Sequence, residues 1–453
     1  MTEKPKIIKR VSQIKRRAVV KEFSFDQQDL PRQLTDALNM YHQSSWDAYK
    51  NLPFPSRKEE PERRTDIRAL AIDKFRRIEQ FSRSDFAALD EQYLQPFKDG
   101  KYAGQIILNG NDIQQNLSAK AAGKGVLYTD FRSAEENNSQ LLSTLLGEII
   151  QAEDGKFAAL ASALGQHGVF LYVPKHVVIE APFHSLIWGA PAFSATLTHI
   201  FVWLEEGASV TFVHESASPT FLESAQAFHS GIVELHVGEG AKLNFIELQS
   251  WGEHVWSFSH ERAQVSRDGR LDWIFGAIGT RLSKNFSDID LLGAGARARI
   301  TGFYFCDAHQ HLDHDTQQNH LAPYTTSDLL YKGALFGSSR SVWQGMIYVA
   351  PNAMRTDGYQ GNKNLILSKE ARVDSIPGLE ILTDDVRCSH GATVGRIDEN
   401  ELFYMQSRGI PKREAERLIV KGFFSEILDR IPINLIRERF ERAIDRKMVN
   451  RES

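Results

Sequence analysis

A short motif that recurs through the middle of the chain constrains its fold more than any other feature. The motif is a tight turn around Gly, followed by a strand of alternating side chains, and its copies begin at Glu206, Glu239, Asp268 and Ala294. Successive copies are 26 to 33 residues apart, a spacing typical of repeat architectures in which each coil buries its inner face against the next. A β-sandwich could also hold short alternating strands. The regular turn slightly favours a solenoid.

The chain divides into three regions of different composition. Residues 1–165 are charged and mostly helical in pattern, with a loop at Pro53 and Pro55, because proline removes a backbone donor and disfavours helix in the residue before it. Residues 166–398 consist of short alternating strands separated by turn residues. Residues 399–453 return to helical spacing, with an apolar stripe that predicts packing on the end of the solenoid.

Charge and cysteine content exclude several classes of partner. The net charge is only −4 and aromatic residues are not interleaved with basic ones, so we expect no binding to nucleic acid. No apolar run is long enough to span a bilayer, and the basic first 20 residues lack the apolar core of a secretory signal. The two cysteines, Cys306 and Cys388, are too few for a disulfide framework and fit a reducing compartment. We therefore expect a cytoplasmic protein that does not bind membranes.

The densest group of candidate metal ligands lies between residues 307 and 320. Its members are His309, His311, Asp313, His314, Asp315 and His320. Imidazole and carboxylate groups together suit borderline metals. The alternative is that these side chains only form hydrogen bonds within the strands and turns of the solenoid.

Cys388 and His390 form a second candidate site. They are two positions apart and therefore share one face if the segment is extended. A thiolate and an imidazole can ligate iron or zinc, but two ligands leave such a site incomplete. A nucleophilic Cys-His pair has no evident orienting acid other than Asp384 and Asp385. We expect no catalytic residue here, and another subunit is expected to complete a metal or interface site.

Two enzymatic alternatives can be weighed from the sequence. No phosphate-binding loop of the form Gly-x-x-x-x-Gly-Lys-Ser/Thr occurs, so we expect the chain not to hydrolyse ATP itself. A β-helix carbohydrate-active enzyme would need paired acids or a metal-bound base on one face of the coils. Only the segment 307–320 offers such a cluster.

A series of short motifs follows in fixed order near the end of the chain. They are Pro377-Gly378-Leu379-Glu380-Ile381, Asp384-Asp385-Val386-Arg387-Cys388-Ser389-His390-Gly391-Ala392-Thr393 and Leu402-Phe403-Tyr404-Met405-Gln406-Ser407-Arg408-Gly409-Ile410. Together they resemble the SufB/SufD family of iron-sulfur cluster assembly proteins. The resemblance includes the pattern Asp313, Thr316 and His320, followed by Ser327 and Lys332. This favours the structural interpretation of the segment 307–320.

The resemblance implies a mainly β protein, a right-handed parallel β-helix flanked by N-terminal and C-terminal helical regions. It implies a non-enzymatic subunit that pairs with SufB edge to edge and docks the SufC ATPase through its C-terminal helices. We expect no cofactor on this chain alone, and the resemblance implies an iron-sulfur cluster at the interface with SufB, with His390 and Cys388 as interface or iron-related residues. A homodimer is possible for the isolated chain.

Two positions separate the two family types. SufB-type chains carry a cysteine just before the segment matching Pro377 to Ile381 and a Glu-His-Glu motif around the histidine. This chain has Ala371 and Gly391 at the corresponding positions. The loss of two potential ligands makes the chain more similar to SufD. The N-terminal motifs Leu52-Pro53, Arg57-x-Glu59 and Thr65-Asp66-Ile67-Arg68 also resemble SufD. The Trp that usually precedes the Thr-Asp pair is missing from this chain. A SufB-type cluster scaffold is the alternative.

Overall fold

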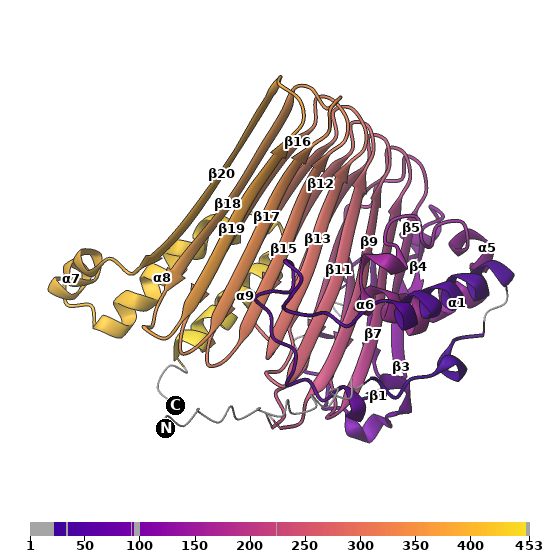
Figure 1. Ribbon diagram of the computed structural model, residues 1–453, viewed down its shortest axis with the longest axis horizontal. Coiled ribbons are helices and arrows are strands. Elements are labelled where there is room, and N and C mark those ends of the chain that lie inside the picture. The colour runs from indigo at the N-terminus through magenta and orange to yellow at the C-terminus, as the bar shows by residue number, and fades with distance from the viewer. Residues whose placement is uncertain (1–21, 33–34, 92, 95–99, 223, 450–453) are drawn as a thin grey trace, which may run out of the picture.

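A parallel β-solenoid of about eight turns forms the centre of the molecule (Figure 1). The computed structural model describes residues 22–32, 35–91, 93–94, 100–222 and 224–449. Each turn gives one strand to each of two ten-stranded sheets. The first sheet consists of β19 (Arg372–Ile381), β17 (Arg340–Val349), β15 (His311–His320), β13 (Leu282–Leu291), β11 (Val255–Val265), β9 (Ala227–Val237), β7 (Ser194–Leu204), β5 (His167–Val173) and β4 (Leu127–Asp130), with β1 (Arg76–Arg77) beside β7. The prediction of a parallel β-helix flanked by helical regions is confirmed.

The second sheet has the same order of turns. It consists of β20 (Val386–Arg396), β18 (Thr356–Ile366), β16 (Thr326–Leu335), β14 (Arg297–Cys306), β12 (Arg270–Ala277), β10 (Lys242–Ser250), β8 (Ser209–Ala217), β6 (Phe183–Trp188), β2 (Gly104–Asn109) and β3 (Asp112–Leu117). All pairings from β5 and β6 onward are parallel, whereas β3 and β4 are antiparallel to their neighbours. We did not expect strands β2, β3 and β4 from the sequence of the N-terminal region.

The recurring turn forms the corner before four strands of the second sheet. Gly207, Gly240 and Gly295 have φ values of 65°, 64° and 75°, in the left-handed region that glycine adopts without steric cost. In the third copy Asp268 takes this conformation, with φ 55°. The backbone N–H of each left-handed residue donates to a carbonyl of the next turn, as from Gly207 to Glu239 at 2.8 Å. The motif therefore links coil to coil, which explains its regular spacing.

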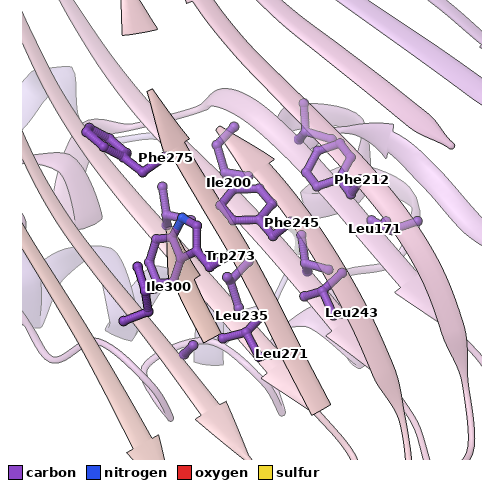
Figure 2. Close-up of a cluster of buried hydrophobic side chains, with 14 of the residues drawn as sticks. Leu171, Ile200, Phe212, Leu235, Leu243, Phe245, Leu271, Trp273, Phe275 and Ile300 are labelled. Atoms are coloured by element: carbon purple, nitrogen blue, oxygen red, sulfur yellow. The ribbon is translucent and has the colours of Figure 1, made fainter. Parts of the chain in front are cut away.

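The interior of the early turns is apolar. Figure 2 shows Phe212, Phe245 and Trp273, which are register neighbours on β8, β10 and β12, pointing into the space between the sheets. Ile200 and Leu235 of the first sheet belong to the same buried cluster. Full burial of each such side chain contributes about 1.5–3 kcal/mol. This interior is the main source of stability of the early turns.

The interior becomes polar in the later turns. The position of Val233 on β9 is occupied by Glu261 on β11 and Ser287 on β13. The Glu261 carboxylate accepts hydrogen bonds from the hydroxyls of Ser259 at 2.6 Å and Ser287 at 2.8 Å. Buried polar groups are tolerated when they are bonded in this way.

Helices cover the outer faces of the two sheets. On the first sheet, α6 (Lys156–Leu164) packs on β7, β9 and β11, and α1 (Asp36–Asn51) packs on α6. The shorter helices of the N-terminal region are α3 (Ala119–Ala122), α4 (Phe131–Asn137) and α5 (Ser139–Leu142), with 3₁₀ turns at Gln27–Asp29, Ile72–Lys74, Ile78–Gln80, Arg83–Asp85 and Ala152–Asp154. Among the described residues, no helix is both long and apolar enough to cross a membrane.

The C-terminal helices are α7 (Glu399–Ser407), α8 (Lys412–Leu428) and α9 (Asn434–Val449). The last two pack on the outer face of the second sheet, where Phe303 contacts the rings of Phe424 and Phe440. We had expected these helices on the end of the solenoid, and that prediction was wrong. The outward residues of the second sheet, such as Ile246 and Ile274, are themselves apolar and need this cover.

Candidate interface site at the open end of the solenoid

The last turn of the solenoid ends in two unpaired strand edges. In the described part of the chain, β19 and β20 each have a strand neighbour on one side only. Figure 1 shows β20 at the outer limit of the sheets, with α7 beyond the end of that strand. Most residues of β20 are exposed, because no further turn covers them. This open end is therefore a surface of free backbone donors and acceptors.

Cys388 and His390 lie on the inner face of this last turn. Their register neighbours on β18 are Gly358 and Gln360. The Gln360 amide is fully buried and donates across the interior to the carbonyl oxygen of Gly378 at 2.8 Å, so this face points inward. Cys388 is half-buried and His390 is exposed. The shared face expected from their spacing is thus present.

The Cys388 thiol and the His320 imidazole both lie beside Gly358. A Cβ atom at Gly358 would lie 3.3 Å from Cys388 Sγ and 3.3 Å from His320 Nε2. His320 is fully buried, and its ring nitrogens lie 2.7 Å from the hydroxyl of Thr325 and 2.8 Å from that of Ser327. Burial lowers the pKa of His320 to about 4 and raises the pKa of the Cys388 thiol. Both groups are therefore neutral near pH 7.

The segment 307–320 does not form one site. Alternation along β15 turns Asp313 and Asp315 outward, toward Lys284 Nζ at 3.0 and 3.6 Å, and turns His314 and His320 inward. His309 lies in the exposed turn before the strand. Within the described residues there is no group of three or more His, Cys, Asp or Glu side chains that could hold a metal ion.

The outward residues of β15 instead anchor the N-terminal segment. The Thr65 hydroxyl donates to the Asp313 carboxylate, and Lys284 Nζ donates to the carbonyl of Pro61 at 2.9 Å. Burial raises the pKa of Asp315 to about 6 and that of Glu62, on the same segment, to about 7. A segment more than 200 residues distant in sequence is thus fastened to the first sheet by hydrogen bonds to both members of the buried Lys284–Asp313 ion pair.

Comparison with known proteins gives the family. Residues 187–423 match the model described as SUF system FeS cluster assembly, SufBD core domain, and residues 15–184 match the SufBD protein N-terminal region. The chain belongs to the SufBD family. It is 29% identical over 321 residues to an iron-sulfur cluster assembly SufBD family protein of Staphylococcus epidermidis, covering 71% of this chain and 69% of the relative. Similar proteins of Staphylococcus haemolyticus and Staphylococcus aureus are 29% and 28% identical over the same shares.

Membership of this family favours iron-sulfur cluster assembly over the polysaccharide-cleaving alternative. Sequence reasoning found Cys388 and His390 but assigned His320 only to hydrogen bonds of the solenoid. The signal that could have shown that His320 lies near Cys388 is the coil period. Ser327, Gly358 and Cys388 occupy one column of the second sheet, about 30 residues apart. His320 reaches that column from the first sheet.

Proposed function

We propose that this SufBD family protein is the SufD-like subunit of an iron-sulfur cluster assembly complex. It pairs with SufB through the open end of the solenoid, and the cluster forms at that junction. The observation that carries the proposal is the coincidence of two unpaired strand edges with an inward-facing Cys388 and His390 in the same turn. The unpaired edges of β19 and β20 can form backbone hydrogen bonds with strands of another chain.

The choice of SufD over SufB rests on two missing ligands. Ala371, just before β19, and Gly391, on β20, replace the cysteine and the second glutamate of SufB-type chains. A chain that keeps only one thiol and one histidine at the junction cannot complete a cluster site alone. We propose that it supports iron acquisition and that it binds no cofactor by itself.

We further propose that SufC docks on the C-terminal helices and that this chain has no enzymatic activity of its own. Helix α7 has no buried residue, and Phe403 and Tyr404 are 72% and 59% exposed. Exposed aromatic side chains are enriched at protein interfaces. ATP-driven movement of SufC would then reach the junction, since α7 directly follows β20.

The test is reconstitution of the complex. The chain, SufB and SufC are co-expressed, and the purified complex is analysed for mass, iron and acid-labile sulfide. We expect a stable ternary complex that carries a cluster, with Phe403→Ser and Tyr404→Ser together reducing SufC recovery at least tenfold. Deletion of all C-terminal helices is unsuitable, because α8 and α9 cover the second sheet.

The matched control is Met40→Ser, which removes a 70% exposed apolar side chain from α1 on the N-terminal side of the fold. It should leave the complex intact. A chain that remains alone in the presence of both partners would contradict the proposal. Full SufC recovery with the double α7 variant would move the docking surface elsewhere.

A further inference from the structure

We propose that a cavity beneath the proline-rich loop 52–62 binds a primary alkylammonium group, carried either by a free amine or by a lysine side chain of another protein. The cavity has a volume of about 250 Å³ and lies on the outer face of the first sheet. Its wall is formed by that loop, by the residues around the start of α6, and by outward side chains of β11 and β13. The cavity is separate from the open end of the solenoid and does not depend on the cluster-assembly role.

The apolar part of the wall suits an alkyl chain. Phe157 and Phe258 both line the cavity, are 2% and 3% exposed, and have ring centroids 4.5 Å apart. Pro53, Pro55 and Pro61 of the loop lie on the same wall. Ligand pockets usually combine such an apolar wall with a few polar groups that fix the orientation of the ligand. Methylene groups can pack on this wall while a charged end contacts the polar groups.

Glu62 supplies a carboxylate that has no cation of its own. Its side chain lines the cavity, and within the described residues no hydrogen bond or ion pair reaches its carboxylate. The ammonium of Lys284 attracts Glu62 electrostatically, but it lies 3.0 Å from Asp313 Oδ1 and donates to the carbonyl of Pro61 at 2.9 Å. Because buried carboxylates are normally paired or hydrogen-bonded, Glu62 is a suitable partner for an incoming cation.

His260 is a second polar group of the cavity without a partner. The residue is 8% exposed, and within the described residues its buried Nδ1 has no hydrogen-bond partner. Nε2 lies beside Gly155, another lining residue, where a Cβ atom would be only 2.5 Å away. Burial lowers the pKa of His260 to about 4, so the imidazole is neutral and does not repel a cation. A neutral imidazole can accept a hydrogen bond from an ammonium group.

The charges around the cavity favour a cation. Lys156 is the one basic residue among the described residues that line it, and its ammonium donates to the carbonyl oxygens of Tyr49 and Leu52. Asp154 pairs with Arg262 at 2.9 Å. A metal ion would make no use of the apolar wall, whereas an alkylammonium group uses both the wall and the excess of carboxylates. The acidic side chains that line the cavity are Glu59, Glu62, Glu153 and Asp154.

The test is isothermal titration calorimetry of the purified full chain with two probes. Cadaverine, an alkyl diamine, represents a free amine, and Nα-acetyl-lysine amide represents a lysine side chain. We expect saturable binding of one probe molecule per chain, and the probe that binds more tightly identifies the source of the ammonium group. Glu62→Gln removes the charge at constant shape and should weaken binding at least about tenfold. Gly155→Ala, which places a methyl group against His260 Nε2, should weaken it to a similar extent.

The pH dependence of binding provides a readout that a purely structural role of Glu62 would not change. Burial raises the pKa of Glu62 to about 7, opposed by Lys284 and assisted by Asp313, Glu59 and Asp315. Only the ionised carboxylate attracts a cation, and the amino groups of both probes stay protonated up to about pH 10. Binding should therefore strengthen about tenfold from pH 6 to pH 8. Glu62→Gln should remove this dependence.

The matched control is Glu60→Gln on the same loop. It removes an equal charge from a side chain that is 61% exposed and does not line the cavity, so it should bind both probes like the wild type. Circular dichroism establishes that each variant is folded. If Gly155→Ala does not fold, Glu62→Gln still decides the outcome, because the Glu62 carboxylate makes no hydrogen bond or ion pair within the described residues.

Three results would overturn the site. They are the absence of saturable binding of either probe up to about 10 mM, equal affinities of the wild type and Glu62→Gln at pH 8, and equal losses of affinity in Glu62→Gln and Glu60→Gln. None of these results depends on SufB or SufC, so the complex could assemble normally while the amine site fails. Conversely, a chain that binds a probe as expected but never joins SufB would contradict the proposed function only.

Discussion

The two ends of the solenoid are built in opposite ways. At the N-terminal end, the first sheet closes with the four-residue antiparallel strand β4, and the second closes with the antiparallel hairpin of β2 and β3. The outermost strand there, β3, carries the exposed polar side chains of Gln114, Gln115 and Asn116. At the C-terminal end, β19 and β20 are long, parallel to their neighbours and uncovered in the described part of the chain. Only one end is protected from further pairing.

This difference indicates which end is an interface. Long unpaired edges template association, so proteins shorten them, charge them or cover them. A terminal repeat normally caps a solenoid with a polar outer face. The inner face of the last turn instead presents Leu379, Ile381 and Val394, which are 37%, 37% and 48% exposed. The C-terminal end therefore has the composition of a turn that another chain covers.

The largest effect should come from the same kind of truncation made at each end. Phe170→Ala removes a fully buried ring that packs with Phe131 and Phe201, and we expect it to lower the free energy of unfolding by about 3–5 kcal/mol. Leu379→Ala at the open end should cost under about 1 kcal/mol in the isolated chain, because its side chain is already 37% exposed. Urea denaturation measures both values.

Addition of SufB should change the effect of Leu379→Ala on the free energy of unfolding. If SufB covers the open end, the cost of Leu379→Ala should rise when stability is measured in the complex, while that of Phe170→Ala stays the same. Equal costs for the two variants in the isolated chain would mean that the open end is already closed, for example by a second copy of the chain.

A smaller effect is expected on the affinity of the chain for SufB. Val394→Lys places a charge on the inner face of the last turn and should weaken binding to SufB at least about 100-fold, or about 2.7 kcal/mol. Because Val394 is exposed, stability of the isolated chain should change by no more than about 0.5 kcal/mol. Titration of labelled SufB measures the affinity.

The control makes the same change at the capped end. Asn116→Lys on β3 is exposed and should leave the affinity for SufB unchanged. If the two lysines weaken binding equally, the effect is one of total charge and the assignment of the interface to the open end is wrong.

Much of this architecture could be predicted from the sequence, and the reasons differ from part to part. The corners were visible because Gly207, Gly240 and Gly295 mark a left-handed turn that few other residues adopt. The face shared by Cys388 and His390 follows from the period of two in a strand. The position of α8 and α9 could not be predicted from the sequence, because an apolar stripe on a helix does not identify the apolar surface on which the helix packs.

The contacts of β15 show a second limit of prediction from a single sequence. Asp313 and His314 are adjacent in sequence, yet one fastens Thr65 and Lys284 on the outer face and the other lies among rings in the interior. In the sequence they form one set of candidate metal ligands, with a structural role as the favoured alternative. The partner of a residue in a solenoid is set by coils about 30 residues away and by segments laid across the sheet, and a single sequence does not identify those contacts.

The smallest effect concerns the polar interior near the open end. His314 is 1% exposed, lies with its ring centroid 5.2 Å from those of Phe275 and Tyr304, and has no hydrogen-bond partner for either ring nitrogen among the described residues. Burial first, and then the positive charge of Lys284, lowers its pKa to about 3.

The pH dependence follows from the direction of this shift. In the unfolded chain the imidazole binds a proton below about pH 6.5, whereas the folded chain does not bind it until far lower pH. Stability is therefore lost as the pH falls from about 6.5 toward the folded pKa, by about 1.4 kcal/mol per pH unit for this one group. His314→Phe should reduce the slope of unfolding free energy against pH by that amount between pH 6 and 5. Phe275→Leu, which alters the same packing without removing a titratable group, should keep the wild-type slope. An unchanged slope for His314→Phe would mean that the imidazole is protonated or hydrated inside the solenoid, and the interior near the open end would then be wetter than its burial indicates.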